Sequence, residues 1–201
     1  MTKKLKTLKR HYGILGGAFD PAHVGHYLIA SYYLALHPTH QLLIIPSYQH
    51  PFLKKMLDFE IRFKHCQMMA QQLGPRAHAL AIEKEIPHTS YTYHVIKKLR
   101  QIYPQSIFEL IVGADAYEHK ESWYLIEKLE KMASFFVVGR AHKKSPQGYL
   151  SFPSISSTQI RKKIKQQKNC GALLLKDIYT DILKNKYYYI DERLLKRPHK
   201  D

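Results

Sequence analysis

Short apolar runs alternate along the chain with longer segments in which apolar residues recur at a helical spacing. The short runs predict strands over residues 12–17, 41–46, 78–83, 107–113 and 134–140. The longer segments predict helices over residues 24–37, 58–74, 89–103 and 123–131. Strands that are apolar on both faces suit a parallel sheet covered by helices. We therefore expect an α/β fold with a doubly wound, mostly parallel sheet and helices on both faces.

Local signals mark several helix ends. Asp58 is expected to cap the second helix and Gly74 to end it, while Thr89 or Ser90 is expected to cap the third. The tail after Cys170 looks like a closing helix with a tyrosine-rich end. At 201 residues the chain is expected to form one domain, with a core over about 11–166 and a helical C-terminal segment over about 167–201.

The composition is that of a globular protein with a sizeable core, since 45% of the residues are hydrophobic and 24% are charged. The longest apolar runs, at residues 42–45 and 135–138, are too short to cross a bilayer. The basic start has no apolar stretch after it, so we expect neither a secretory signal nor a membrane partner. Two cysteines, Cys66 and Cys170, are too few for a disulfide framework and are expected to be reduced thiols of a cytoplasmic protein.

The net charge of +16 favours a polyanionic ligand. Nucleic acid, phosphorylated metabolites and an acidic membrane surface all have that character, and charge alone does not choose among them. A basic nucleic-acid-binding protein is thus an alternative of a different class. However, the basic residues gather at the two ends and around residues 162–168, and no RNA-recognition motif is present. Nucleic acid is therefore not expected as the main ligand.

The first strand, turn and helix carry candidate chemistry in the sequence ILGGAFDPAHVGH, residues 14–26. Gly16 and Gly17 allow a sharp bend and a close approach of backbone to ligand, and the following helix offers unpaired N–H groups that suit a phosphate. His23 and His26 stand three residues apart, so both rings can face one side. They could pack and cap, bind zinc, or hold phosphate oxygens; zinc is disfavoured because no third ligand lies at a useful spacing.

A second candidate site is the sequence PSISSTQIRKKI, residues 153–164. Ser156 and Gln159 have the spacing of a capping box, and Arg161 follows in the first turns of the same helix. A helix start with serine hydroxyls and an arginine suits a polyphosphate, although a capped surface helix would have the same pattern.

Together, GGAFDPAHVGH and ISSTQIR resemble the two signatures of the HxGH nucleotidyltransferase superfamily, which is related to class I aminoacyl-tRNA synthetases. The resemblance implies a Rossmann-like fold and an ATP site in which His23 and His26 contact phosphates, with His26 stabilising charge on the α-phosphate. It implies that Ser156, Ser157 and Arg161 bind the β- and γ-phosphates. The catalytic residues so implied are His26, His23 and Arg161. The ATP-binding residues so implied are Gly16, Gly17, Ala18, Phe19, His23, Gly25, His26, Gly113, Asp115, Ser156, Ser157 and Arg161.

One residue departs from the first signature. Relatives usually carry Ser or Thr where this chain has Ala18, and that hydroxyl is thought to help hold a phosphate. Ala18 has no hydroxyl, so the backbone N–H groups of Ala18 and Phe19 are expected to serve alone or with water.

Between the two motifs, over about residues 12–165, the chain resembles bacterial nicotinate-mononucleotide adenylyltransferases. The similar features are SYT at 90–92, GAD at 113–115 and WY at 123–124. The resemblance implies that Asp115 and the Gly113 amide hold a ribose. It also implies that Thr92, Trp123 and Tyr124 line a nicotinate pocket, where the indole can stack on a pyridinium ring. Trp123 could equally anchor its helix in the core.

The loop after the second predicted strand departs from that family. Relatives usually carry a P-x-x-x-P-P-H-K sequence, whereas residues 46–55 read PSYQHPFLKK. His50, Lys54 and Lys55 are the candidates for contacts with the acceptor, but only the role of the loop is carried over. This departure leaves nicotinamide mononucleotide open as the acceptor. Transfer to another phosphorylated metabolite, such as phosphopantetheine, is the alternative within the superfamily.

The implied reaction moves the adenylyl group of ATP to the 5′-phosphate of nicotinate mononucleotide, giving deamido-NAD and pyrophosphate in NAD biosynthesis. The acceptor phosphate is already an oxyanion at neutral pH, so catalysis needs positioning and electrostatic stabilisation rather than a general base. Mg²⁺ is expected as a cofactor held mainly by ATP phosphates, because no dense carboxylate cluster lies near the motifs. No metal ligated by protein side chains is expected. The sequence specifies no oligomeric state.

Overall fold

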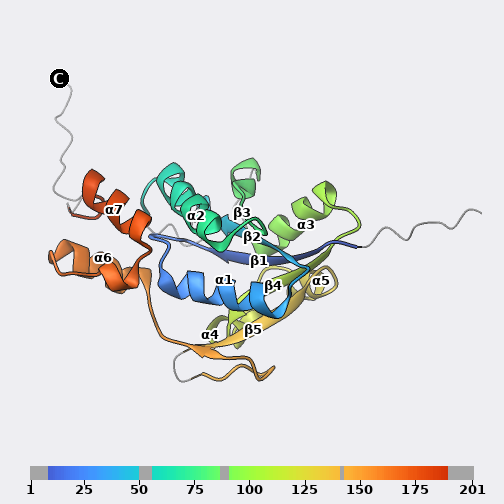
Figure 1. Cartoon of the computed structure of the whole chain (residues 1–201). Coiled ribbons are helices and arrows are strands. Elements are labelled where there is room, and N and C mark those ends of the chain that lie inside the picture. Colours follow the sequence, from blue (N-terminus) through green and yellow to red (C-terminus); the bar gives the residue numbers. More distant parts are fainter. Residues whose placement is uncertain (1–8, 50–55, 87–90, 141–142, 190–201) are drawn as a thin grey trace, which may run out of the picture.

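The strands form a single parallel sheet in the computed structural model, which describes residues 9–49, 56–86, 91–140 and 143–189 (Figure 1). The strands are β1 (His11–Gly17), β2 (Gln41–Pro46), β3 (Ala77–Ala79), β4 (Ile107–Gly113), β5 (Ser134–Arg140) and β6 (Ser151–Phe152). Their order is β3-β2-β1-β4-β5-β6, and each neighbouring pair is parallel. This doubly wound, Rossmann-like order confirms the expected fold, and it reverses between β1 and β4, where such sheets bind ligands.

Helices follow most strands, as expected for crossover connections. They are α1 (Val24–Leu36), α2 (Phe59–Leu73), α3 (Thr92–Ile102), α4 (Ala114–Tyr117), α5 (Ile126–Glu130), α6 (Ser157–Lys165) and α7 (Lys176–Asn185). Short 3₁₀ turns span Ile82–Glu85, Lys120–Ser122 and Gly171–Leu173.

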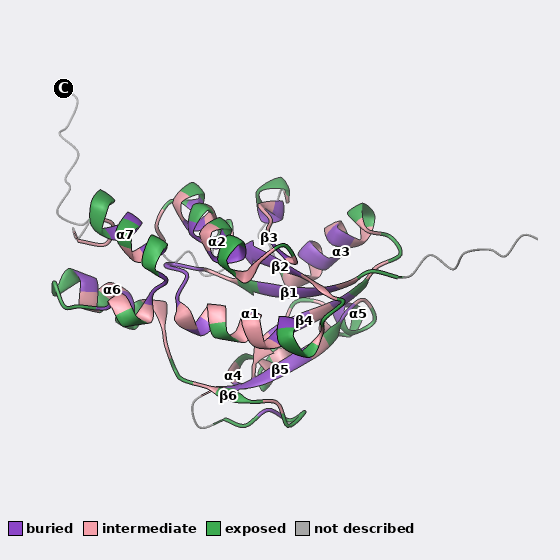
Figure 2. Cartoon of the chain, in the orientation of Figure 1, coloured by how far each residue is buried: buried purple, intermediate pink, exposed green. Residues whose placement is uncertain are grey.

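The sheet has an apolar core on each face because successive strand residues point to opposite sides. In β1, Ile14 packs in the core covered by α3 and α5, while Leu15 packs in the core covered by α1, α2, α6 and α7. Figure 2 shows the buried residues along the central strands and on the helix faces turned toward them. The central strands are therefore buried on both sides, which explains their continuous apolar sequence.

Several local predictions are confirmed. The bounds of β2 and β5 are those expected, and the Asp58 side chain accepts a hydrogen bond of 2.8 Å from the Glu60 amide at the start of α2. Gly74 ends α2 with a φ of 91°, a backbone conformation that suits glycine. Cys66 and Cys170 are free, buried thiols.

Other local predictions are wrong. The strand expected over 78–83 ends at Ala79, and Ile82–Glu85 is a 3₁₀ turn. Ile82 is buried there as it would be in a strand, so the short apolar run did not distinguish the two structures. The helix expected from residue 123 begins only at Ile126, after Leu125 in a left-handed conformation. Helix α3 begins at Thr92, with Tyr91 at its N-cap; Thr89 and Ser90 lie outside the described residues.

The C-terminal helices lie beside the amino end of α1 (Figure 1). Ile160 and Ile164 of α6 and Ile178 and Ile182 of α7 are buried in the same core as residues of α1 and α2. Within the described part of the chain, no helix is both long and apolar enough to cross a membrane.

Candidate active site

The loop that links β1 to α1 lies at the carboxyl end of β1, between the neighbouring strands β2 and β4. The Ser47 amide donates a 2.9 Å hydrogen bond to the Gly17 carbonyl, which joins the ends of β1 and β2. Gly16 is exposed, and Ala18 is half-buried. The predicted glycine turn therefore stands at the point where the strand order reverses.

The two histidines of this loop are brought together. His23 is the N-cap residue of α1 and is 4% exposed, while His26 is half-buried one turn later. Their rings stack with centroids 3.7 Å apart, and the His23 amide lies 3.2 Å from the His26 Nδ1 to which it donates. Gly25 is buried between them. Both rings therefore lie together at the start of α1, which is the arrangement that a phosphate site requires.

Both imidazoles are neutral at neutral pH. Burial, with a smaller effect from the Arg140 guanidinium, lowers the pKa of His23 to about 4. Burial, then the His23 ring and Arg140, lower the pKa of His26 well below its ordinary value. Because His26 Nδ1 accepts a hydrogen bond, the proton of the neutral ring is on Nε2, which is a donor. The Nδ1 of His23 is shielded from solvent and has no partner among the described residues.

The start of α6 is bonded to the same loop. Arg161 donates a 2.6 Å hydrogen bond to the Asp20 carbonyl, and its guanidinium lies 3.5 Å from the Asp20 carboxylate. The Ser157 hydroxyl donates to the Pro21 carbonyl at 2.9 Å. Ser156 is the N-cap, and its hydroxyl accepts from the Gln159 amide at 3.2 Å. The two sequence motifs therefore meet in space although 141 residues separate Asp20 from Arg161.

Sequence reasoning missed Arg62, whose side chain ties three loops together. It is 1% exposed, and its guanidinium donates to the carbonyls of Ala18, Ser47 and Leu57, each at 2.8 Å. The sequence sign that could have identified Arg62 is a charged residue on the buried face of α2, four residues before Cys66. A charged side chain so deeply buried needs several hydrogen bonds, and here they fix the glycine turn.

Asp20 was also missed, together with Tyr188. The Asp20 side chain is buried, and its Oδ1 accepts from the Tyr188 hydroxyl at 2.8 Å and from the Leu57 amide at 3.2 Å. The carboxylate raises the pKa of Tyr188, as burial does to a larger extent, so the hydroxyl keeps its proton. The tyrosine-rich segment after α7 therefore contributes to holding the active-site loop.

Gly113 and Asp115 lie at the end of β4 and the start of α4. A Cβ at residue 113 would lie 2.5 Å from Asp115 Oδ1, so glycine is needed for this carboxylate to fold back over the strand end. The other oxygen, Oδ2, accepts from Arg140 at 3.2 Å, and Arg140 also donates to the Ile155 carbonyl at 3.3 Å. Asp115 Oδ1 has no partner among the described residues and remains an acceptor.

A cavity of about 440 Å³ lies beside the glycine turn. Its lining includes Gly16, Gly17, Ser47, Thr92, Trp123 and Tyr124. Trp123 also packs edge-on against Phe135, with ring centroids 5.9 Å apart. The two roles considered for Trp123, anchoring its segment in the core and lining the pocket, are thus compatible. One side of the ring packs in the core, and the residue still lines the cavity. Tyr124 stacks on Tyr91 at 4.7 Å.

The structure therefore gathers the predicted residues of the two motifs at one end of the sheet, next to the cavity that holds Thr92, Trp123 and Tyr124. A groove of about 370 Å³ beside Arg161 is lined by Thr158, Lys162 and Lys165 as well. His50, Lys54 and Lys55 lie outside the described residues.

The comparisons with known proteins agree with this arrangement. The chain matches the cytidylyltransferase-like family over residues 14–163. It is 32% identical to nicotinate-nucleotide adenylyltransferase of Bacillus subtilis (strain 168) over 170 residues, which cover 81% of this chain and 89% of that protein. A protein of Anaeromyxobacter dehalogenans named "Probable nicotinate-nucleotide adenylyltransferase" is 32% identical over 168 residues, 82% of this chain and 89% of that one.

Solved structures have the same fold. Nicotinic acid mononucleotide adenylyltransferase from Plasmodium falciparum, complexed with NaAD, superposes with a TM-score of 0.76 at 19% identity, over 89% of this chain and 97% of that chain. The same enzyme complexed with APC superposes with a TM-score of 0.74 at 18% identity.

Proposed function

The chain belongs to the nicotinate-nucleotide adenylyltransferases within the cytidylyltransferase-like family, and we propose that it transfers the adenylyl group of ATP to nicotinate mononucleotide. The products are deamido-NAD and pyrophosphate. The observation that carries this proposal is the meeting of the His23–His26 pair with the start of α6 beside the Trp123 cavity. Donors for a polyphosphate and an aromatic-lined cavity for an acceptor lie next to each other there. The two free thiols suit the cytoplasmic location that we propose with it.

The histidine pair supplies electrostatic stabilisation. The Nε2–H group of neutral His26 can donate to an α-phosphate oxygen, where charge grows as the fifth bond to phosphorus forms. A bound triphosphate brings negative charge close to both rings, which raises their pKa values and strengthens these hydrogen bonds. The 5′-phosphate of the acceptor attacks in line and needs no base, so placing the two anions is the main catalytic task.

The α6 helix is placed to hold the leaving pyrophosphate. Arg161 is 31% exposed beside Asp20, and Lys162 and Lys165 line the groove next to it. Cationic groups at that position offset the charge that accumulates on the leaving group. Because the Ser157 hydroxyl proton is directed to the Pro21 carbonyl, we expect the Ser157 amide, rather than the hydroxyl, to contact phosphate.

Mg²⁺ fits this site as a partner of the nucleotide rather than of the protein. Asp20 accepts hydrogen bonds at Oδ1 and faces Arg161 at Oδ2, and Asp115 Oδ2 is paired with Arg140. Neither carboxylate offers an unengaged pair of oxygens. The ATP phosphates and water would therefore hold the ion, which neutralises phosphate charge when bound.

The cavity favours a nicotinate acceptor. Thr92 is the first residue of α3, so the positive end of that helix faces the cavity, and an anionic ring carboxylate is stabilised there more than a neutral carboxamide. Trp123 and Tyr124 offer aromatic faces to the pyridinium ring. Asp115 Oδ1 lacks a partner among the described residues but is shielded from solvent, so this carboxylate would turn outward to accept a ribose hydroxyl.

The test supplies ATP and Mg²⁺ with nicotinate mononucleotide, nicotinamide mononucleotide or phosphopantetheine, and measures pyrophosphate release and dinucleotide formation. We expect the highest kcat/KM with nicotinate mononucleotide. Equal rates with the two pyridine nucleotides would contradict the role of the α3 terminus. No dinucleotide from either would overturn the proposed function, and salt-sensitive RNA retention without turnover would favour the nucleic-acid-binding alternative.

A further inference from the structure

A second cluster of histidines lies at the opposite end of the sheet, where the strands begin. His11 is the first residue of β1, His37 follows α1, and His40 immediately precedes β2. Glu109 lies near the start of β4, paired in register with Gly13 of β1. The proposed adenylyltransferase reaction takes place at the carboxyl ends of these strands and uses none of these side chains.

Three of these residues converge. His37, His40 and Glu109 each offer a possible ligand atom, and these three atoms all lie within 4.8 Å of one another. All three residues are half-buried. The His37 and His40 rings stack with centroids 4.5 Å apart, and His11 also stacks on His40, at 4.6 Å.

One buried nitrogen in this cluster is unsatisfied. His37 Nε2 is shielded from solvent and has no hydrogen-bond partner among the described residues. Buried polar atoms are rarely left in this condition, because each costs free energy unless something binds to it. His37 is also the C-cap residue of α1, whose carbonyl end carries partial negative charge and favours a cation.

Tyr33 orients the neighbouring groups. Its hydroxyl lies 2.9 Å from His40 Nδ1, and the Glu109 carboxylate is close to it. If the hydroxyl donates to the carboxylate, it accepts from His40 Nδ1–H, which leaves the lone pair of His40 on Nε2. A Cβ at Gly13 would lie 2.3 Å from the Tyr33 ring, so the strand carries a glycine where this ring crosses it. Such hydrogen bonds to a carboxylate and an imidazole are the usual support of metal ligands.

The backbone between the two histidines is held in place. Arg76 donates to the carbonyls of His37 at 2.8 Å and of His40 at 3.2 Å, and also to the Leu34 carbonyl at 2.9 Å. These bonds fix the turn from α1 to β2, so the two imidazoles start from a defined geometry.

We propose that His37, His40 and Glu109 form a binding site for Zn²⁺. Two imidazoles and one carboxylate are a common zinc ligand set. Soft metal ions that prefer thiolates, and hard ions that prefer only oxygen ligands, suit this set less well. Bonds of about 2.0–2.2 Å need ligand atoms about 3.3–3.5 Å apart. Because the atoms now lie within 4.8 Å of one another, the side chains would close by up to about 1.5 Å. The nearly parallel rings, 6° apart, require one imidazole to rotate as the ion binds.

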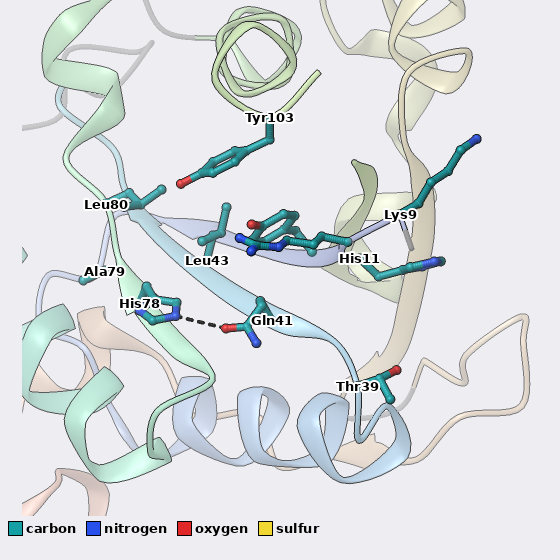
Figure 3. A pocket seen from close by; sticks show the side chains of 11 residues that line it. Lys9, His11, Thr39, Gln41, Leu43, His78, Ala79, Leu80 and Tyr103 are labelled. Atoms are coloured by element: carbon teal, nitrogen blue, oxygen red, sulfur yellow. Dashed lines mark hydrogen bonds between the residues drawn. The ribbon is translucent and has the colours of Figure 1, made fainter. Parts of the chain in front are cut away.

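Water would take the fourth position of the ion, because the convergent group among the described residues offers three ligand atoms. The nearby His11 lines a second cavity, of about 960 Å³, between the starts of β1 and β2 (Figure 3). Because the ligands come from the end of α1, the start of β2 and β4, the ion would link three elements and stabilise this end of the fold.

The experiment uses untagged, metal-free, full-length protein titrated with Zn²⁺, and with Co²⁺ as a spectroscopic probe. We expect the chain to bind one equivalent, to show a visible absorption band of tetrahedral Co²⁺, and to have a higher Tm with Zn²⁺. His37→Gln and His40→Gln should each weaken binding by at least about 100-fold. Tyr33→Phe keeps the ring and should weaken it about 10–100-fold, the usual effect of removing a supporting hydrogen bond.

His78→Gln is the matched control, because His78 lines the same second cavity but bonds Gln41 instead of the cluster. Wild-type binding of this control supports the proposal. No binding to the wild-type chain, or unchanged stoichiometry and affinity in His37→Gln, would overturn it. Circular dichroism establishes that each variant is folded; should the glutamine variants unfold, the Tyr33→Phe titration decides. All variants should retain adenylyl transfer, so a failed zinc site and a failed reaction are separable.

Discussion

Helix α1 has a pair of histidines at each end, with the same spacing and opposite surroundings. His23 and His26 stand at its amino end, beside backbone N–H groups and arginines. His37 and His40 stand at its carboxyl end, beside Glu109 and backbone carbonyls that accept hydrogen bonds from Arg76. The helix dipole makes the first position suit an anion and the second a cation. Two histidines three residues apart therefore specify no chemistry by themselves; their place on the helix and their neighbours do.

The largest expected difference between the pairs is in catalysis. His26→Ala removes the Nε2–H group that we propose donates to the α-phosphate, so we expect kcat/KM to fall by about 10²–10³, or about 2.7–4 kcal/mol of barrier. The matched change at the other end, His37→Ala, should leave the rate within about twofold. Pyrophosphate release with nicotinate mononucleotide measures both. Near wild-type turnover by His26→Ala would remove this residue from the mechanism and erase the contrast between the pairs.

The amino-end pair should also make stability depend on pH. The pKa of His23 is lowered from 6.5 to about 4 in the folded chain, so between these values the unfolded chain binds more protons. Its contribution to stability is present above pH 6.5 and is lost as the pH falls toward 4, by up to about 3 kcal/mol. Urea unfolding at several pH values, compared between wild type and His23→Gln, measures this contribution. Parallel curves for the two proteins would show that His23 is not responsible.

A smaller effect is expected from the support of the amino-end loop. Tyr188→Phe removes one hydrogen bond to the buried Asp20 carboxylate. Hydrogen bonds to charged groups contribute about 1.5–3 kcal/mol, so unfolding in urea should shift by that amount. Tyr124→Phe, which changes an exposed tyrosine elsewhere in the fold, is the control for stability. If Tyr188→Phe is as stable as wild type, the Leu57 amide and Arg161 suffice to hold Asp20.

Much of the fold was predictable because the central strands are buried on both faces, and such strands are continuous apolar runs. Strands β2 and β5 were therefore located to the residue. The 3₁₀ turn at Ile82–Glu85 was not, because Glu83 leaves the strand path to accept a bond from the Tyr48 amide, 35 residues earlier. The sequence has no local sign of a contact over that distance.

The candidate site shows the same division. The two motifs were identified by their resemblance to known signatures, since residue types and spacing left other roles open, and the structure brings them together. Arg62 and Asp20 were missed because their roles consist of bonds to backbone carbonyls and to Tyr188, which no spacing indicates. No metal ligated by side chains was expected, because no dense carboxylate cluster lies near the two motifs in the sequence. Glu109 lies 69 positions after His40, and only the pairing of β1 with β4 places it beside the histidines.

The bonds from Arg161 and Ser157 to the Asp20–Pro21 backbone determine when the site can form during synthesis of the chain. During translation the imidazole pair leaves the ribosome long before α6 has been synthesised. A nascent chain can thus complete most of the sheet while α6, whose residues we propose bind the leaving group, is still missing. With the proposed role of Arg161, turnover should begin only after α6 has been synthesised, so shorter polypeptides should not consume ATP.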